Sequence, residues 1–236
     1  MKLPTGYLLK CLFLLDKNRL LWYSDNEHKS RMHWDHSALF YFTGKRMMKV
    51  DRTTELLTDS PVIAAVKDDA GLRQAPNSDC QVVFLLFGTI LNIGNLVDMV
   101  HRRNKVCFVH LDLIEGLSNR EIAVDALVQL GSPDGIISTR TPQIRRAQQL
   151  GILTIQRVFL LDSMSLQSLL TTMDAYHPDY IEVLPGVIPS VIAEITAKTT
   201  IPIIAGGLIR SKQDVIQALQ AGAIAVSTSC RAVWKM

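Results

Sequence analysis

Eight short apolar runs, spaced between residues 62 and 226, constrain the fold of this 236-residue chain more than any other feature. Each run is continuous rather than alternating, which is typical of strands buried on both faces of a parallel sheet. Amphipathic stretches lie between most of the runs, so the pattern predicts alternating strands and helices. The predicted strands are Val62–Val66, Val82–Leu86, Val106–Leu111, Gly135–Ser138, Leu153–Val158, Tyr180–Val183, Pro202–Ala205 and Ala223–Val226.

Eight such units predict an α/β fold, a small (β/α)8 TIM-like barrel over residues 47–236. Each unit is about 24 residues long, short against the typical ~250-residue barrel. Only seven residues follow Ser229, so the eighth helix is predicted to be truncated. The surface that it leaves uncovered favours a homo-oligomer. A doubly wound open sheet is the alternative fold, and the lack of a G-x-G-x-x-G after the first strand weighs against it.

Some helix ends can be read from the sequence as well. Ser211 with Asp214 three residues later resembles a capping box. Pro142 suits a first helical turn. Asn119 is a plausible N-cap for the helix that follows it.

Residues 1–46 differ from the rest of the chain. They carry eight Lys and Arg against four Asp and Glu, whereas the other residues carry seventeen against eighteen. Their apolar and aromatic residues show no clean period. We interpret them as an N-terminal extension, either disordered or the result of a start assigned upstream of a true start at Met47 or Met48. An ordered extension packing on the barrel is the alternative. Three histidines here, His28, His33 and His36, lack a completed ligand set and are predicted to be solvated rather than metal-bound.

Composition excludes several classes of protein. Four scattered cysteines without a C-x-x-C indicate a reducing cytoplasm and no zinc site. No apolar run reaches the ~20 residues that a membrane-spanning helix needs. The nearly neutral body provides no overall field to attract nucleic acid.

The last two predicted strands point to a ligand. One runs into Gly206 and Gly207, and the next runs into Ser227 and Thr228. Together they are similar to the last two strands of a barrel that holds a phosphate at its C-terminal face. Glycine lets backbone N–H groups approach phosphate oxygens, and hydroxyls add neutral donors. The alternative is a plain glycine turn.

Charged residues follow other predicted strands and would meet at the same face. Lys67, Arg140 and Arg157 could add positive charge, while Asp112 and Glu182 could accept from hydroxyls. This set predicts a site for a small phosphorylated polyol. An internal Arg157–Glu182 ion pair is the alternative. His110 is more simply a satisfied core histidine.

Catalytic groups are not evident in the sequence. There is no Ser/His/Asp arrangement, metal triad or clear Schiff-base lysine, so a sensor is favoured over an enzyme.

The strings themselves resemble one family, the glycerol uptake operon antiterminator regulatory proteins (the GlpP family). The resemblance covers about residues 56–236. It rests on these strings in this order: SPVIAAVK from Ser60, VHLDLIEGL from Val109, DGIIST from Asp134, IQRVFLLDS from Ile155, EVLPG from Glu182, IAGGLI from Ile204 and AVSTS from Ala225, followed by Val233-Trp234.

The resemblance implies a TIM-barrel-like regulator with glycerol 3-phosphate as effector and no cofactor. It implies action on the leader mRNA of glycerol-utilisation genes, which lets transcription pass a terminator. Phosphate contacts are carried over to Gly206, Gly207, Ser227 and Thr228. Contacts with the polyol end are carried over to Asp112, Arg157 and Glu182.

Binding of RNA would need a local basic patch. The candidates are Arg102, Arg103, Lys105, Arg145 and Arg146, although such residues are more often a solvated helix face. No RRM, KH or similar module is present. Two other functions stay open. One is a barrel enzyme acting on a small phosphate ester, with Glu182 or Asp112 as general base. The other is a paralogue that keeps the phosphate site without RNA binding or catalysis.

Overall fold

The computed structural model describes residues 21–22, 33–34 and 36–236, with side chains from residue 46 onward except 172–175. The chain divides into two compact units, residues 1–48 and 49–236. In the first unit, strand β1 (Leu21–Trp22) pairs antiparallel with β2 (His33–Trp34). Helix α1 (His36–Asp59) begins in this unit and continues past the predicted boundary at residue 46 into the second.

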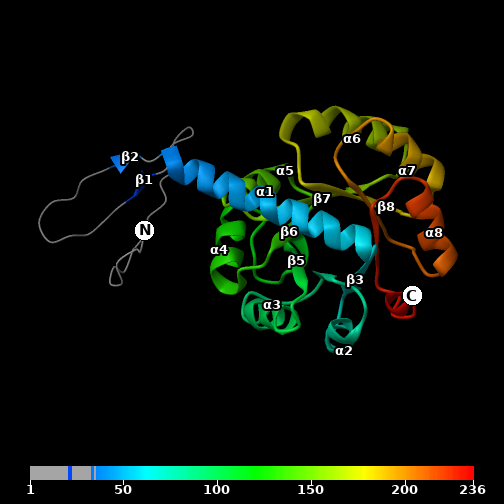
Figure 1. Cartoon of the computed structure of the whole chain (residues 1–236), viewed down its shortest axis with the longest axis horizontal. Helices are drawn as coiled ribbons and strands as arrows, with labels where there is room; N and C mark the ends of the chain where they lie inside the picture. The colour runs from blue at the N-terminus through cyan, green and yellow to red at the C-terminus, as the bar shows by residue number, and fades with distance from the viewer. Residues whose placement is uncertain (1–20, 23–32, 35) are drawn as a thin grey trace, which may run out of the picture. The chain divides into compact units, whose positions relative to one another are not determined.

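The second unit is a closed barrel of eight parallel strands (Figure 1). Each predicted apolar run forms one strand, so the predicted TIM-like barrel is confirmed and the open sheet is wrong. Strand β10 closes the ring by pairing with both β9 and β3. The strands are β3 (Val62–Val66), β4 (Val82–Leu85), β5 (Val106–His110), β6 (Gly135–Ser138), β7 (Leu153–Phe159), β8 (Tyr180–Leu184), β9 (Ile203–Gly206) and β10 (Ala225–Thr228).

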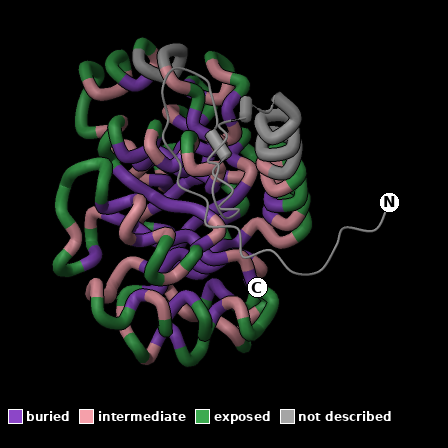
Figure 2. Tube along the Cα trace, turned by 90° about the vertical axis from the view of Figure 1, so that its left-hand side faces the viewer, coloured by how far each residue is buried: buried purple, intermediate pink, exposed green. Residues whose placement is uncertain are grey.

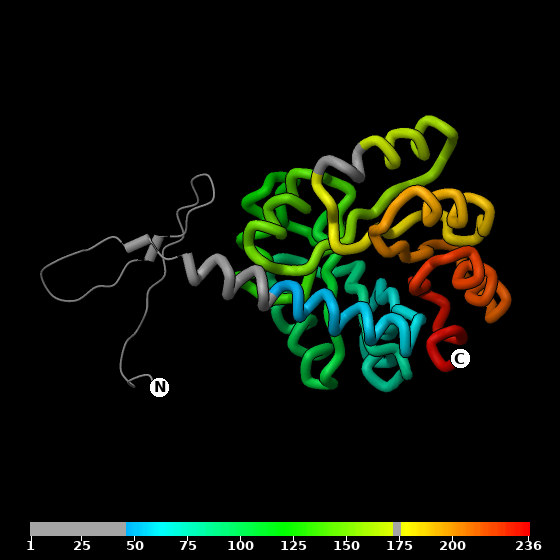
Figure 3. The backbone as a smooth tube through the Cα atoms, turned by 45° about the horizontal axis from the view of Figure 1, so that its top comes forward, coloured from blue at the N-terminus to red at the C-terminus, as the bar shows by residue number. Residues whose placement is uncertain are grey.

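Helices connect successive strands and surround the barrel (Figures 1 and 3). After β10 the chain forms only the 3₁₀ turn η3 (Val233–Lys235), which confirms the truncated eighth helix. The red C-terminal turn lies beside the teal α2 in both views. The connecting helices are α2 (Asp69–Gln74), α3 (Ile93–His101), α4 (Ile122–Gly131), α5 (Thr141–Gln149), α6 (Ser163–Tyr176), α7 (Pro189–Thr196) and α8 (Lys212–Gln220), with 3₁₀ turns η1 (Ala75–Asn77) and η2 (Leu111–Leu113).

Local signals explain some of these boundaries. Ser211 and Asp214 form both hydrogen bonds of a capping box at the start of α8, as predicted. Pro142 lies in the first turn of α5, also as predicted. The predicted N-cap at Asn119 is wrong, because α4 begins at Ile122 with Glu121 as its cap residue.

Alternate strand residues face the barrel interior and the surrounding helices, as the period of two requires. The inward set forms one apolar cluster that includes Ile63, Phe84 and Phe108, and the outward set packs under the helices. Figure 2 shows buried residues, in purple, gathered at the centre, with exposed residues of helices and loops around them. Residue 135, the first of β6, is glycine because a Cβ there would lie 2.4 Å from the Phe108 ring.

The N-terminal end of the barrel is closed by the last part of α1. Leu57 is 1% exposed and belongs to the interior cluster. The Tyr180 hydroxyl lies 3.1 Å from the carbonyl oxygen of Val50, to which it donates, and 2.9 Å from Thr54 Oγ1. Burial raises the pKa of this phenol to about 12, so it stays protonated and keeps its donor.

Candidate functional site

Polar side chains replace apolar ones in the interior layer at the C-terminal end of the barrel. These positions continue the inward-facing parity of their strands. We call them the polar layer: His110 of β5, Arg157 of β7, Glu182 of β8, Gly206 of β9 and Ser227 of β10. Since parallel strands all end on one side, five strands bring these residues to one place, on the face where barrels carry their functional sites.

Glu182 is the centre of this layer and is fully buried. Arg157 Nε donates to Glu182 Oε2 at 2.6 Å, and the Ser227 hydroxyl donates to Glu182 Oε1 at 2.5 Å. A buried carboxylate without such partners would cost several kcal/mol. The pairing also explains Gly206, because a Cβ there would lie 2.5 Å from Glu182 Oε1. The internal Arg157–Glu182 ion pair, which the sequence offered as the alternative to ligand contacts, is therefore formed.

Arg157 is only partly used by this ion pair. Among hydrogen bonds to described residues, its guanidinium donates only through Nε. The side chain is 8% exposed and lies at the mouth of the barrel. A guanidinium carries five N–H donors, so its two Nη atoms can serve a ligand while Nε holds Glu182.

His110 is buried but not satisfied, unlike the core histidine that the sequence favoured. Its Nδ1 has no hydrogen-bond partner among the described residues and lies 4.0 Å from Asp112 Oδ2. Burial, followed by the nearby Arg157 charge, lowers the pKa of His110 to about 4. The imidazole is therefore neutral near pH 7, with an unmatched nitrogen beside Arg157.

Asp112 is bonded to the loop after β6, and its predicted contact with a polyol stays a prediction. Its carboxylate accepts from the backbone N–H of Thr139 at 2.7 Å and from the Thr139 hydroxyl at 2.9 Å. Ser138 Oγ lies 3.1 Å from Asp112 Oδ1, and Arg140 Nε lies 3.6 Å from the same oxygen. These contacts order the loop after β6. Asp112 therefore fixes the loop after β6 at the mouth of the barrel.

Two buried glutamines near this loop also carry unmatched atoms. Gln143 Oε1 accepts from Ser138 Oγ at 2.6 Å, but its Nε2 has no partner among the described residues. Gln156 Nε2 donates to the Thr139 carbonyl at 3.0 Å, and its Oε1 is likewise unmatched. Sequence reasoning missed Ser138, Gln143 and Gln156 as a network, since only their hydrogen bonds across three elements reveal it.

The predicted phosphate residues divide into two groups. Gly207 has φ +75° and Leu208 φ +62°, so the loop after β9 is left-handed at two successive residues. For an exposed leucine this conformation costs about 1–2 kcal/mol, a strain typical of functional loops. The Thr228 hydroxyl instead donates to the Ile209 carbonyl at 2.6 Å, and the Ser227 hydroxyl is directed to Glu182. As arranged here, both hydroxyls donate within the protein, and their contact with a phosphate stays a prediction.

Lys67 is exposed and follows β3, next to β10 in the barrel. Its position continues the inward-facing parity of Ile63 and Ala65. Around the mouth, Lys67, Arg140 and Arg157 supply positive charge, which Asp68, Asp112 and Glu182 offset. The cations offer contacts to an anion.

The predicted RNA-binding residues are not equivalent in the structure. Lys105 is buried, with its ammonium donating to the carbonyls of Ser78 at 2.8 Å and Cys80 at 2.5 Å, so its prediction is wrong. Burial lowers its pKa. Arg146 forms a two-point ion pair with Asp125 that lowers the pKa of that carboxyl. It is therefore engaged between α4 and α5.

Three of the predicted cations remain on the surface. Arg102 and Arg103 are exposed after α3, and Arg103 Nη1 donates to Asn77 Oδ1 at 3.3 Å. Arg145 is exposed on α5, with its guanidinium carbon 5.9 Å from the centre of the Tyr176 ring. The two arginine surfaces belong to different helices.

Two further predictions concern metals and membranes. Within the described side chains, no group of three or more His, Cys, Asp or Glu is arranged to hold a metal ion. The side chains of His28, His33 and His36 lie outside that part of the chain. Of the helices that the structure describes, none has the length and apolar character needed to cross a membrane.

Fold and site together define a (β/α)8 barrel protein with a charged, hydrogen-bonded site at the C-terminal ends of its strands. Residues 62–234 match the model of the glycerol-3-phosphate responsive antiterminator family, and the chain belongs to that family. It is 40% identical over 181 residues to the uncharacterized protein YgcP of Escherichia coli (strain K12), covering 77% of this chain and 95% of that one.

Solved structures agree with this assignment. A glycerol uptake operon antiterminator regulatory protein from Listeria monocytogenes is 36% identical, with a TM-score of 0.72 over 74% of this chain and 95% of that one. An antiterminator-related protein from Thermotoga maritima is 32% identical, with a TM-score of 0.67 over 74% and 98%. A deoxyribose phosphate aldolase from Aeropyrum pernix shares only the fold, at 14% identity and a TM-score of 0.57 over 80% and 94%. The resemblance to the antiterminator family is confirmed, and the chain belongs to a family of regulators.

Proposed function

We propose that this protein binds glycerol 3-phosphate at the polar layer and thereby controls its own action on the leader mRNA of glycerol-utilisation genes. The observation that carries the proposal is the buried Arg157–Glu182–Ser227 chain, with neutral His110 beside it. In a chain of this family, such a site offers both charge and hydrogen-bonding groups to a small phosphorylated polyol.

Each part of the ligand has a counterpart at the mouth of the barrel. The phosphate would meet the left-handed loop at Gly207 and Leu208 after β9, with Lys67 after β3, two strands along the ring. The hydroxyl groups would meet Arg157 Nη and His110 Nδ1. Because a site built to hydrogen-bond a hydroxyl rejects analogues that lack it, glycerol 3-phosphate should bind far better than inorganic phosphate.

A regulatory role without catalysis fits these contacts better than turnover does. Both oxygens of Glu182 are bonded, and Asp112 accepts from the loop after β6, so neither carboxylate is placed as a free base. Lys105 is the buried lysine of the described residues, and it binds carbonyls of the loop before β4 rather than lying at the polar layer. An enzyme acting on a phosphate ester remains the alternative that a turnover assay decides.

Control of RNA binding requires two states that the effector binds unequally. The loops at the mouth carry exposed apolar side chains, including Phe159, Leu161 and Leu208 at 49%, 84% and 59% exposure. Closure of these loops over a ligand would bury apolar area and supply part of the difference between states. We also propose that the protein is a cytoplasmic homo-oligomer.

The test is thermal unfolding of the full chain with glycerol 3-phosphate, glycerol or inorganic phosphate. A ligand that binds only the folded state raises the melting temperature with concentration. We expect a rise with glycerol 3-phosphate alone. Gly207→Val should abolish the rise, whereas Gly151→Val should keep it, since Gly151 has a matching φ of +71° outside the site.

Three outcomes would contradict the proposal or a part of it. No rise with any of the three compounds would remove the effector site. Turnover of glycerol 3-phosphate or a related ester that disappears in Glu182→Gln would favour the enzyme. An unchanged affinity for the leader RNA in the presence of glycerol 3-phosphate would remove the regulatory coupling while leaving the binding site.

A further inference from the structure

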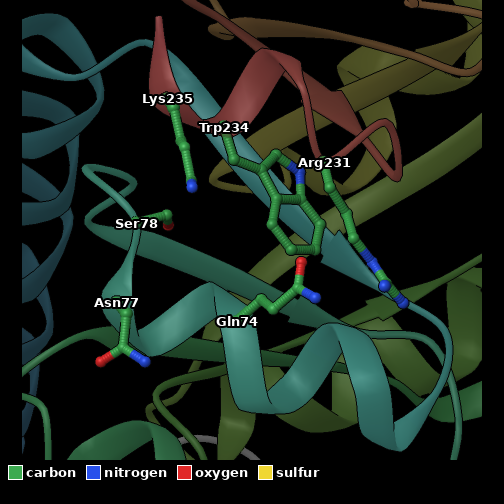
Figure 4. A pocket seen from close by; sticks show the side chains of 6 residues that line it. All are labelled: Gln74, Asn77, Ser78, Arg231, Trp234 and Lys235. Carbon is green, nitrogen blue, oxygen red and sulfur yellow. The ribbon is translucent and has the colours of Figure 1, made fainter.

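A cavity of about 340 Å³ lies on the flank of the barrel, away from the polar layer. It opens where the short turn η3 stands in place of an eighth helix and faces α2 and η1. We call it the flank cavity; its lining is Gln74, Asn77, Ser78, Arg231, Trp234 and Lys235. Figure 4 shows Lys235 and Trp234 reaching from the C-terminal turn toward α2 and η1, with the Gln74 amide pointing back at the indole.

Cations from three segments gather at this cavity. Arg231 and Lys235 come from the C-terminal turn, and Arg103 from the end of α3 reaches Asn77 on the rim. Arg73 is exposed in the last turn of α2, and its carbonyl accepts from Asn77. The Lys105 ammonium lies beneath, bonded to the carbonyl of Ser78. Segments that are far apart in sequence thus form one positive surface.

The nearby carboxylates neutralise only part of this charge. Asp68 Oδ1 lies 2.8 Å from Arg231 Nη2, and the two side chains are 47% and 39% exposed. The Gly71 backbone N–H and then Arg231 lower the pKa of Asp68. Asp79 is exposed close to Lys105. An exposed ion pair of this kind is weak, so Arg231 can exchange its partner for a phosphate.

The chemistry of the lining favours a nucleic acid over a protein. Lysine is depleted in protein interfaces, whereas Lys and Arg beside amide and hydroxyl groups are the usual contacts to phosphates and base edges. Single-stranded RNA displays its base edges for such amides. We propose that the flank cavity is where this protein holds unpaired RNA, with Arg103, Arg231 and Lys235 on phosphates and Gln74 and Asn77 on a base.

This inference rests on the proposed function and adds a route to it. The Trp234 indole N–H donates to the Thr228 carbonyl at 2.8 Å. Thr228 follows Ser227, which donates to Glu182 in the polar layer. The Thr228 hydroxyl also accepts from the Cys230 backbone N–H at 2.9 Å. A shift of Ser227 on effector binding would therefore move Thr228 and, through this hydrogen bond, the Trp234 side chain that lines the cavity.

The experiment measures binding of the full chain to a fluorescent pool of random-sequence 20-nucleotide RNA, by anisotropy at several salt concentrations. We expect the double variant Arg231→Gln/Lys235→Gln to lose about tenfold in affinity. Its salt dependence should fall by about 1.4 in slope, since each contact to single-stranded RNA contributes roughly 0.7. Arg103→Gln should show a smaller loss. Lys198→Gln, at an exposed lysine after α7, is the matched control and should bind like wild type, and Arg145→Gln tests the rival surface on α5.

Folding of each variant is checked by its melting temperature and by the rise with glycerol 3-phosphate, which the cavity variants should keep. Ultraviolet crosslinking to the same RNA should label peptides that contain residues 73–78 and 231–235. Trp234→Phe should bind RNA and glycerol 3-phosphate separately but show a smaller effect of one on the other.

Several results would overturn the inference, and they are distinguishable. The double variant could bind RNA like wild type, or only Arg145→Gln could lose affinity. Either result would show that RNA binds at another surface, and neither would contradict the proposed function. A changed sedimentation coefficient with unchanged RNA affinity would make the cavity a contact between copies. No binding of RNA by wild type, with or without glycerol 3-phosphate, would overturn the inference and the RNA part of the proposed function together.

Discussion

The same strands form an apolar interior at one end of the barrel and a polar interior at the other. At the N-terminal end, Leu57 of α1 closes an interior of Phe84, Phe108 and Tyr180, in which the rings of Phe84 and Phe108 meet edge to face at 5.7 Å. At the C-terminal end, the interior layer contains Arg157, Glu182 and an unmatched His110 nitrogen. One end is apolar and closed, and the other is polar and incompletely bonded.

The difference shows that the two ends contribute unequally to the stability of the fold. Burial of apolar area at the closed end stabilises the barrel by about 25 cal/mol per Å². Burial of an ion pair and an unmatched nitrogen at the other end gives little or no net gain, because desolvation offsets the attraction. Such a layer is expected where binding has been favoured over stability.

The largest expected effect comes from breaking the buried ion pair. Arg157→Met leaves Glu182 buried without its partner and should destabilise the protein by about 3–5 kcal/mol, measured by urea unfolding. The control is Lys198→Ala, which removes an exposed pair with Glu194 and should cost about 0.5 kcal/mol or less. The double variant Arg157→Met/Glu182→Leu should recover most of the stability but bind no effector. A double variant as unstable as the single would contradict this view of the polar layer.

Truncating Leu57 at the N-terminal end of the barrel should lower stability without affecting effector binding. Leu57→Ala deletes a side chain that is 1% exposed and should destabilise by about 2–4 kcal/mol. Effector affinity, measured by calorimetry below the melting temperature, should stay within about twofold of wild type. A tenfold loss of affinity would show that the two ends are coupled.

Acid should lower the stability of the protein through His110, which belongs to the polar layer at the C-terminal end of the barrel. Its folded pKa of about 4 lies below the ordinary value of 6.5, so the unfolded chain binds the proton more readily. Stability is therefore fully present above about pH 7, falls as the pH drops from 6.5 to 4, and is lower by about 3 kcal/mol at pH 4. Urea unfolding across this range should show a shallower decline in His110→Gln. An equal decline in both proteins would assign the acid sensitivity elsewhere.

The smallest expected effect is at the hydroxyl of Tyr180. Tyr180→Phe keeps the ring in the core but removes the hydrogen bonds with Val50 and Thr54. We expect a loss of about 1–1.5 kcal/mol and unchanged effector binding. A loss above 3 kcal/mol would mean that the ring itself had moved.

Much of the barrel could be predicted because burial on both faces leaves a direct trace in sequence. The run at Gly135–Ser138 forms a strand with the predicted bounds, and the run at Leu153–Val158 forms one that extends a single residue further. Helix starts were less certain, since Asn119 has the right side chain for a cap but lies three residues before α4.

The site could be predicted only as a set of strand ends. Polar residues after strands indicated the correct face and the possible Arg157–Glu182 pair, but not the other partners. The roles of Asp112 and Thr228 depend on loops that fold back to meet them, and those distances have no counterpart in local sequence. Lys105 was expected on the surface because lysine usually is, whereas two carbonyls of another segment hold it inside. Long-range hydrogen bonds decide these cases.

The closing contact of the ring sets an order of events during synthesis. Strand β10 pairs with β3, and Arg231 reaches Asp68 across 163 positions of sequence. Neighbouring strands such as β3 and β4 can pair early, but contacts this distant form late. Ser227 and Gly206 both belong to the last two strands, so a growing chain contains Glu182 well before it contains these neighbours. We expect a nascent chain to be unresponsive to the effector until its final strand has emerged, so that sensing begins only with the finished molecule.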